Sequence, residues 1–379
     1  MNARLPIALT AVLSAAALTA CGNDSSDGDS AAAPPPATDT RADDTAQADG
    51  GDATAAQSNR PRTIATGLQV PWGIGFEPGR NGDALVAERT TGRIIRIRRP
   101  GGKKSVVHRV RGVDTGNSEG GLLGLAVSPN YAKDKLVYVY YTRGGGSENR
   151  IVRFKLGGRP QTVLGGLEAQ QIHNGGRIKF GPDGKLYATV GDAGDTSNAQ
   201  DRGSQNGKIL RMNPDGSVPA DNPIRGSRVW SLGHRNPQGI DWDSRKRLWS
   251  AEFGQNTFDE VNLIQKGKNY GWPDVEGRGD TQGGKYVNPK VQWTTAESSP
   301  SGLAISKGRL FVAALGGEGL WRSRLNGANT TKPVKLYAGR YGRIRTVVKA
   351  PDGSVWFSTS NRDGRGDPKR GDDRILRIR

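Results

Sequence analysis

Cysteine is nearly absent from this sequence of 379 residues, in which Cys21 is the single one. No disulfide can form within the chain, so cross-linking contributes nothing to its stability. Long apolar runs are missing as well, because the run over residues 5–20 is too short to span a bilayer as a helix. A basic helical stripe and an aromatic-basic RNA motif are also absent, so we expect no nucleic-acid partner despite a net charge of +18.

The first 21 residues have the pattern of an export signal. Arg4 is followed by an apolar run rich in Ala and Leu, which ends in the sequence LTAC at residues 18–21. Small residues before a cysteine resemble the lipobox of bacterial lipoproteins, in which that cysteine receives a lipid. We therefore predict a signal peptide over residues 1–21, lipidation at Cys21, and an exported lipoprotein that is held at the cell envelope through this lipid alone. An ordinary cysteine near a cleavage site is the alternative.

Residues 22–60 have the composition of a disordered tether. They consist almost wholly of Ala, Asp, Ser, Thr, Gly and Pro, contain no aromatic residue, and carry eight Asp against two Arg, a net charge of −6. Such a segment buries too little apolar surface to offset the entropy lost on ordering. Residues 61–379 then carry +23, which favours attraction to an anionic envelope or to an acidic ligand.

Residues 61–379 show short alternating runs between turn signals and little helical periodicity, which is typical of an all-β domain. The runs fall into six copies, each with an opening strand, a turn, a second strand and an outer strand. The opening strands are expected near Trp72, Leu122, Arg177, Gly239, Gly302 and Arg345. Six such units predict a six-bladed β-propeller, in which radial sheets bury both faces on their neighbours. A pair of β-sandwiches is the alternative, and the signature of a WD40 array is missing.

Two polar segments border the third unit, at His173–Arg177 and at Gly191–Asp195. A hairpin would bring their ends together. Asp192 could then accept the proton of one ring nitrogen of His173 and leave the other nitrogen free to act as a base. A structural histidine bonded to a loop carbonyl is the alternative.

Two further segments offer guanidinium groups at strand starts. Arg235 and Asn236 precede a proline-fixed turn, an arrangement suited to binding carbonyl or carboxylate oxygens. Arg343 and Arg345 are two residues apart, so strand alternation places both side chains on one side. Paired guanidinium groups on one face favour an anionic ligand. A salt bridge between blades and a solvated basic strand are the alternatives.

Several of these segments also carry a resemblance to a known family. The most informative segments are EGGLLG at 119–124, HNGGR at 173–177, GD at 191–192, QNGK at 205–208, GHRNPQ at 233–238, DE at 259–260, NYGWP at 269–273, and the pair Arg343 and Arg345. In this order they resemble the glucose/sorbosone dehydrogenase family, which includes soluble glucose dehydrogenases that use pyrroloquinoline quinone (PQQ) and the aldose sugar dehydrogenases. The resemblance covers about residues 61–379.

The resemblance implies roles for the matched residues. His173 is expected to be the general base that removes the proton of the sugar C1 hydroxyl, with Asp192 as its orienting partner. Arg235 is expected to stabilise negative charge on the quinone oxygen. The residues expected to contact the sugar are Glu119, His173 and Arg235. The residues expected to bind PQQ are Arg235, Asn236, Gln238, Arg343 and Arg345, the last two through its carboxylates.

The same resemblance implies two Ca²⁺ ions. The backbone carbonyls of Gly254 and Gln255 would hold one ion beside the cofactor. Asp259, Glu260 and the carbonyl of Tyr270 would hold a second, structural ion. Oxygen ligands of this kind suit a hard cation. A solvated acidic turn is the alternative for Asp259 and Glu260.

Three positions depart from the family pattern. Glu119 and Ile172 stand where soluble glucose dehydrogenase carries contacts to glucose, so we expect a more open site with a broad sugar preference. Gly316 stands where relatives place a Lys or Arg that contacts the quinone. Either Arg322 or another basic residue replaces this charge, or PQQ binds weakly or not at all.

These observations lead us to expect a PQQ-dependent aldose dehydrogenase that oxidises C1 of the sugar to a lactone and passes electrons to an external acceptor. A propeller without catalytic activity that binds an envelope glycan or a protein is one alternative, because hedgehog-interacting proteins resemble the same family. A metal-dependent lactonase is another, although fold alone does not decide function.

Overall fold

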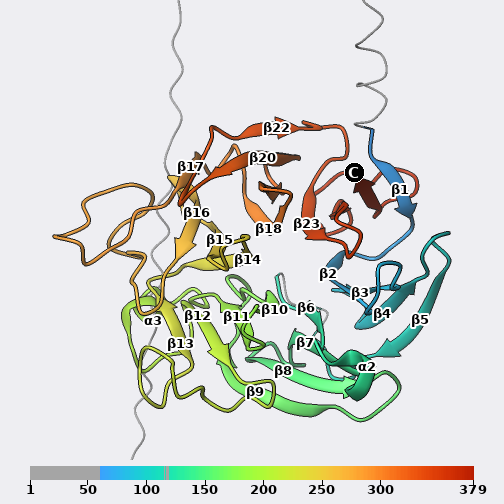
Figure 1. Cartoon of the computed structure of the whole chain (residues 1–379), viewed down its shortest axis with the longest axis horizontal. Helices are drawn as coiled ribbons and strands as arrows, with labels where there is room; N and C mark the ends of the chain where they lie inside the picture. The colour runs from blue at the N-terminus through green and yellow to red at the C-terminus, as the bar shows by residue number, and fades with distance from the viewer. Residues whose placement is uncertain (1–59, 115, 117–118) are drawn as a thin grey trace, which may run out of the picture. The chain divides into compact units, whose positions relative to one another are not determined.

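The computed structural model describes residues 60–114, 116 and 119–379. The predicted signal peptide, Cys21 and the tether up to residue 59 lie outside these residues. Six antiparallel sheets of four or five strands surround a common axis (Figure 1). The predicted six-bladed propeller is therefore confirmed, and a pair of sandwiches is excluded. No helix within the described part of the chain is long and apolar enough to cross a membrane.

Each blade follows the chain from the inner to the outer strand, with one exception. Blade 1 contains β2 (Pro71–Phe76), β3 (Ala84–Glu88), β4 (Arg93–Ile97) and β5 (Lys104–Arg109). Blade 2 contains β6 (Leu122–Val127), β7 (Leu136–Thr142), β8 (Glu148–Lys155) and β9 (Gln161–Glu168). Blade 3 contains β10 (Ile178–Phe180), β11 (Leu186–Val190), β12 (Lys208–Met212) and β13 (Val229–Leu232).

Blade 4 contains β14 (Asn236–Trp242), β15 (Leu248–Phe253), β16 (Phe258–Ile264) and β17 (Val291–Thr294). Blade 5 contains β18 (Pro300–Ser306), β19 (Arg309–Ala314), β20 (Gly319–Asn326), β21 (Asn329–Thr330) and β22 (Val334–Leu336). Blade 6 contains β23 (Ile344–Lys349), β24 (Val355–Thr359) and β25 (Ile375–Ile378). Two short helices, α2 (Tyr131–Asp134) and α3 (Ser197–Gln200), lie in connections.

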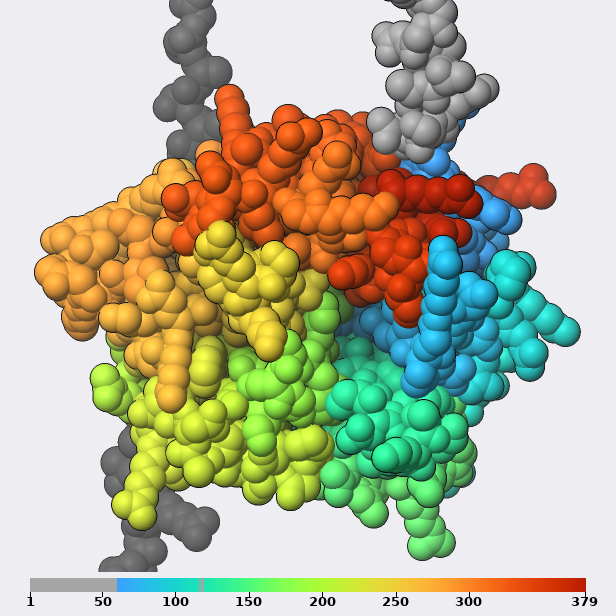
Figure 2. Space-filling model, viewed as in Figure 1, coloured from blue at the N-terminus to red at the C-terminus, as the bar shows by residue number. Residues whose placement is uncertain are grey.

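The exception is blade 6, whose outermost strand comes from the other end of the described chain. The strand β1 (Arg62–Ala65) pairs antiparallel with β25, with Arg62 opposite Arg377. The first and last residues of the propeller therefore lie side by side, as the blue and red atoms do in Figure 2. The sequence repeats did not predict this closure, because β1 shares no motif with the outer strands of the other blades.

Glycine in the inner strands allows neighbouring blades to approach closely. A Cβ atom added to Gly124 of β6 would lie 2.2 Å from the carbonyl oxygen of Gly176, and one added to Gly239 of β14 would lie 2.5 Å from that of Ser301. Both distances are shorter than van der Waals contact, so a larger residue would force the inner strands apart. Apolar side chains fill the space between blades, with Trp72, Trp249 and Trp356 almost completely buried.

One buried guanidinium group joins four blades near the axis. Arg177 donates from Nε to the carbonyl of Gln238 (2.8 Å), from one terminal nitrogen to the carbonyl of Trp72 (3.2 Å), and from the other to the hydroxyl of Thr346 (3.3 Å). Its guanidinium carbon also lies 4.0 Å from the centroid of the Trp72 ring. Burial lowers the pKa of Arg177 to about 9. This residue therefore ties inner strands of blades 1, 3, 4 and 6 together.

Candidate active site

The polar segments found in the sequence gather on one face of the ring. All inner strands run in the same direction, so their starts lie on one face and the ends of the second strands return to it. His173 precedes β10, Arg235 precedes β14 and Arg343 precedes β23, whereas Asp192 follows β11 and Asp363 follows β24. We call this face the mouth of the propeller.

His173 and Asp192 form a buried pair at the mouth. The Nδ1 atom of His173 lies 2.6 Å from Oδ1 of Asp192, and the residues are 8% and 0% exposed. An ionised carboxylate only accepts hydrogen bonds, so the proton of this pair belongs to Nδ1 and Nε2 is left as an acceptor. The predicted hairpin pairing is present, and it gives His173 the tautomer that a general base requires.

The carboxylate of Asp192 is fixed by two further donors. Its Oδ1 accepts the backbone N–H of Gly194 (2.8 Å), and its Oδ2 accepts the indole N–H of Trp272 (2.8 Å). His173 itself adopts a left-handed backbone conformation, with φ of 57°, which is uncommon for a residue with a side chain. Such a conformation at a polar site indicates that the surrounding contacts hold the ring where it is needed.

Arg235 lies over the ring of Trp272. Its guanidinium carbon is 5.5 Å from the centroid of that ring, and its Nε is buried without a hydrogen-bond acceptor among the described residues. Burial lowers the pKa of Arg235, while the nearby carboxylates of Asp192, Glu276, Glu252 and Glu119 oppose this shift. A buried donor without a partner is costly, so this side chain is suited to an oxygen atom supplied by a ligand.

Asn236 and Gln238 have structural partners at this site. The side-chain oxygen of Asn236 accepts the N–H of Gly175 (3.0 Å), which ties blade 4 to the loop that carries His173. The side-chain oxygen of Gln238 accepts the hydroxyl of Ser301 (2.8 Å). Gln238 also lines the central cavity, whereas no contact of Asn236 with that cavity is present. The two predicted cofactor ligands therefore differ in their access to it.

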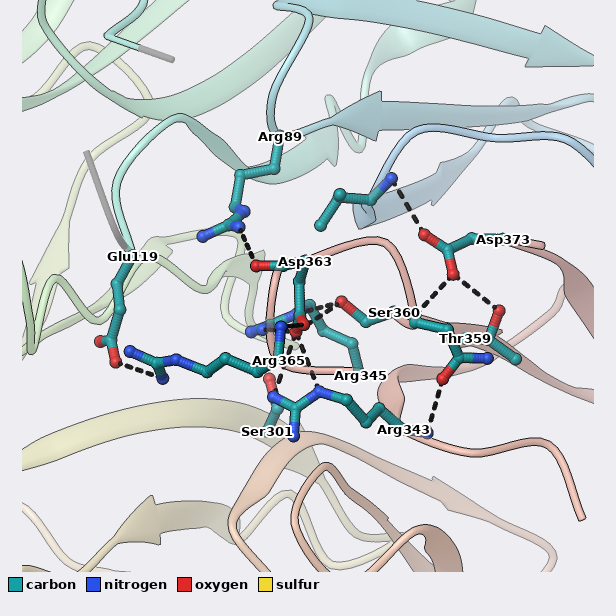
Figure 3. A network of polar contacts seen from close by, with 12 residues as sticks. Arg89, Glu119, Ser301, Arg343, Arg345, Thr359, Ser360, Asp363, Arg365 and Asp373 are labelled. Carbon is teal, nitrogen blue, oxygen red and sulfur yellow. Dashed lines mark hydrogen bonds and ion pairs between the residues drawn. The ribbon is translucent and has the colours of Figure 1, made fainter. Parts of the chain in front are cut away.

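A cavity of about 200 Å³ opens between the blades at the mouth. It is lined by Arg89, Glu119, Gln238, Phe253, Ser299, Leu315, Arg343, Arg345, Asp363 and Arg365. Figure 3 shows that the charged members of this set converge from blades 1 and 6 and from the connection before blade 2. Four guanidinium groups against two carboxylates make the cavity cationic.

Asp363 binds Arg343 and Arg345, the two arginines that were predicted to lie on one side of a strand. Its Oδ2 accepts hydrogen bonds from Arg343 (3.1 Å) and Arg345 (3.2 Å), and Arg345 also donates to the hydroxyl of Ser360 (3.0 Å). Burial raises the pKa of the Asp363 carboxyl, but the charges of Arg345 and Arg343 outweigh it, so the pKa lies below its usual range. The prediction that both arginine side chains lie on one side of the strand is confirmed.

Glu119 links the cavity to the histidine. Its Oε2 accepts the backbone N–H of His173 (3.0 Å), and its Oε1 forms an ion pair with Arg365 (3.2 Å, Figure 3). The charge of Glu119 also acts on both Arg235 and Arg345. The groups at 173, 235, 343 and 345 therefore share one mouth, with Glu119 between them.

Three of the predicted calcium ligands, Gly254, Glu260 and Tyr270, line one small pocket. Asp259 and Glu260 are successive residues of β16, so their side chains leave opposite faces of the strand. Asp259 accepts the N–H groups of Gly254 (3.0 Å) and Ser299 (2.6 Å), whereas Glu260 accepts from Asn262 and Gly277. Among the described residues no three His, Cys, Asp or Glu side chains are grouped to hold a metal ion. Asp259 and Glu260 are therefore held by different partners, and the structural Ca²⁺ site stays a prediction.

The turn that carries Gly254 and Gln255 is nevertheless held rigidly. One oxygen of Glu276 accepts four consecutive backbone N–H groups, from Gln255, Asn256, Thr257 and Phe258, at 2.7 to 3.1 Å. Burial raises the pKa of Glu276, but these hydrogen bonds outweigh it and lower the pKa. Phe253, directly before this turn, lines the central cavity, so the turn lies beside it.

Sequence reasoning missed four contributors to the site: Arg89, Trp272 as a partner of Asp192, Asp363 and Arg365. Arg89 follows β3, and Asp363 and Arg365 follow β24, at the same places in their blades where Asp192 follows β11. The blade alignment could have indicated them, because equivalent loops lie at the same mouth. Gly316 does not line the cavity, and neither does Arg322, so Arg89 and Arg365 supply the additional positive charge there.

Comparison with known proteins agrees with this geometry. The model of the family described as Glucose / Sorbosone dehydrogenase matches residues 68–376. The PQQ-bound form of aldose sugar dehydrogenase from Streptomyces coelicolor is 50% identical, with a TM-score of 0.79, over 83% of this chain and 96% of that chain. Aldose sugar dehydrogenase YliI of Escherichia coli is 28% identical over 78% of this chain and 89% of its own length.

A third relative, quinoprotein glucose dehydrogenase B of Acinetobacter calcoaceticus, is 33% identical over 60% of this chain and 55% of its own length. The family match covers most of the chain, from before β2 into β25. The chain belongs to the glucose/sorbosone dehydrogenase family, and the three relatives named above are quinoprotein and aldose sugar dehydrogenases.

Proposed function

We infer that the protein oxidises aldose sugars at C1 to lactones with PQQ as cofactor and passes the electrons to an external acceptor. The observation that carries this conclusion is the His173–Asp192 pair beside a cavity with four guanidinium groups. The pair supplies a base, and the cavity supplies a site for a polyanionic cofactor. The named activities of the similar proteins support the same assignment.

The cavity fits PQQ in charge, and Arg235, which lines a smaller pocket that shares Phe253 with the cavity, has an unused donor. PQQ is a planar quinone with three carboxylates, and guanidinium groups bind carboxylates through two parallel hydrogen bonds. Arg343 and Arg345 would hold these carboxylates. Arg89 or Arg365 would supply the positive charge that relatives place at the position of Gly316. The unpartnered Nε of Arg235 would face a quinone oxygen. When bound, PQQ would supply the acceptor for the two electrons and the hydrogen of C1.

Side chains of this protein would accept the proton of the sugar C1 hydroxyl. Asp192 keeps the ring proton of His173 on Nδ1, so Nε2 can take the proton of the C1 hydroxyl as the C1–H bond breaks. The positive charge that forms on the imidazole is then stabilised by the buried carboxylate. Arg235 would stabilise negative charge on an oxygen opposite the base, in a buried position where such an interaction is strong.

The sugar pocket is open on one side. Ile172 is 40% exposed next to the catalytic histidine, and Glu119 is partly exposed with an ion pair to Arg365. These side chains offer one apolar contact and one carboxylate, which select aldoses by their C1 hydroxyl more than by their other hydroxyls. We therefore propose a broad preference among aldoses.

We propose a Ca²⁺ ion beside the cofactor. The carbonyls of Gly254 and Gln255 belong to the turn that Glu276 fixes beside the cavity, and carbonyl oxygens are ligands that Ca²⁺ accepts. An ion held there would add positive charge next to the cofactor. Lipidation at Cys21 and export to the envelope complete the proposal, with the membrane contacted through the lipid alone.

A dye-coupled assay tests the proposed function. The purified chain is incubated with PQQ and Ca²⁺, and reduction of an artificial dye is followed across a panel of aldoses. We expect turnover of several aldoses, and its loss in His173→Gln with retained PQQ binding. A non-catalytic binding protein or a lactonase would show no sugar-dependent dye reduction, and either result would contradict the proposal.

A further inference from the structure

A second cavity of the described chain lies away from the mouth. It has a volume of about 610 Å³, within the range of ligand-binding pockets. Its lining residues come from turns where inner strands end, such as Arg80 after β2 and Asp352 after β23, and from the free ends of β1 and β25. Since the starts of the inner strands form the mouth, this cavity opens on the opposite face of the ring, between blades 6 and 1.

The base of this cavity is a fixed ionic cluster. Asp352 accepts hydrogen bonds from Arg99 (2.7 Å) and Arg377 (2.8 Å), and the side chains of Arg99 and Asp352 are 7% and 12% exposed. Arg99 also lies against the rings of Phe76 and Trp356, with its guanidinium carbon 5.5 and 5.2 Å from the two ring centroids. The neighbouring charges and hydrogen bonds lower the pKa of Asp352 despite its burial, so its carboxylate stays ionised.

The rim adds positive charge without a matching carboxylate. Five more cationic side chains line the cavity: Arg62, Arg80, Arg98, Lys307 and Arg379. With Arg99 and Arg377 they make seven cations, and Asp352 is the single acidic side chain in the lining, which leaves a charge of +6. The Nε of Arg377 is buried and has no acceptor among the described residues. Like charges held this close repel one another, and a bound anion would relieve the repulsion.

We propose that this cavity is a binding site for ligands with several phosphate groups. The fixed Arg99, Arg377 and Asp352 cluster shows that the base already holds one anionic group between two guanidinium groups. Six of the seven cations are arginines, whose planar forks bind phosphate oxygens in pairs. This proposal is independent of the proposed sugar oxidation, which takes place at the mouth.

Two probes distinguish the possible sources of phosphate. Tripolyphosphate, measured by titration calorimetry, represents a soluble anion. Vesicles of cardiolipin, whose headgroup carries two phosphates, and phosphatidylcholine, measured by sedimentation against vesicles of phosphatidylcholine alone, represent a lipid headgroup. Both use the full chain with Cys21→Ser, because a lipid on Cys21 would attach the chain to any vesicle.

The decisive comparison uses two double variants with the same change in net charge. Arg80→Ala with Arg98→Ala removes two exposed rim cations, and Arg159→Ala with Arg225→Ala removes two exposed cations from turns of blades 2 and 3 on the same face. We expect the rim variant to bind tripolyphosphate at least about tenfold more weakly, because it would lose charge-assisted hydrogen bonds to two phosphate oxygens. The matched variant should bind as the parent does.

Specific loss of vesicle binding in the rim variant would identify a phospholipid headgroup as the source. Loss confined to tripolyphosphate would identify a soluble anion. The proposal is overturned if neither probe binds the parent chain, or if the two double variants lose binding equally. Sugar oxidation should stay unchanged in both variants, because neither touches the mouth.

Discussion

The Asp192→Asn substitution tests how the site prepares its base. Asp192 accepts three donors, namely Nδ1 of His173, the N–H of Gly194 and the indole N–H of Trp272. The amide and indole groups can only donate, and an asparagine has one oxygen instead of two. Its NH₂ group must therefore face either the indole or the histidine.

Both orientations damage the site in a predictable way. If the NH₂ group faces Trp272, two donors oppose each other in a buried position, at a cost of about 1–3 kcal/mol. If it faces His173, it donates to Nδ1 and moves the ring proton to Nε2. A protonated Nε2 cannot accept the proton of the C1 hydroxyl, so the general base is lost. Since general base catalysis contributes about 10²–10⁴-fold, we expect kcat/KM for aldose oxidation to fall by about that factor.

The assay is sugar-dependent dye reduction at saturating PQQ, with PQQ affinity measured separately. Asp195→Asn is the matched control, because Asp195 lies three residues away in the same loop but is exposed and bonded to Ser197. It should keep the activity of the parent. An Asp192→Asn chain that binds PQQ normally and retains most of its activity would refute the reasoning.

Three further outcomes are expected. Gly239→Ala should lower the free energy of unfolding by about 1–3 kcal/mol, because the new Cβ would lie 2.5 Å from the carbonyl oxygen of Ser301, and chemical denaturation measures this. The Asp363 carboxylate has a lowered pKa, so the stability it gains from Arg343 and Arg345 should be complete above about pH 4 and lost as the pH falls further. Thermal melts should accordingly show an advantage over Asp363→Asn at pH 7 that shrinks at pH 3, and an unchanged difference would contradict this. Chelation of Ca²⁺ should weaken PQQ binding in a fluorescence titration while the far-ultraviolet circular dichroism stays that of the folded propeller.

The fold could be predicted from the sequence because its repeats are local. Each unit places an opening strand, a turn and a second strand within a few residues, so motif spacing alone indicates six blades. The pairing of β1 with β25 could not be predicted in this way, because it joins residues that are far apart in the sequence. A long-range pairing of this kind leaves no local pattern.

The parts of the site that depend on local geometry could also be predicted from the sequence. His173 and Asp192 sit at the two ends of one hairpin, so their contact followed from local geometry. Asp363 and Arg365 follow β24 as Asp192 follows β11, so an alignment of equivalent loops would have indicated that they lie at the mouth. The pairing of Asp259 with Glu260 as calcium ligands did not follow strand alternation, which directs successive side chains to opposite faces.

The central claim is that one mouth brings a base and a set of guanidinium groups to the same cofactor. An anaerobic single turnover tests it most directly: the chain is loaded with PQQ, an aldose is added without an electron acceptor, and the absorbance of the bound quinone is recorded. The account predicts reduction of the quinone in the parent chain, and an unchanged spectrum in His173→Gln loaded with the same amount of PQQ. A parent chain that binds PQQ but leaves it oxidised, or a His173→Gln chain that reduces it equally fast, would contradict the account.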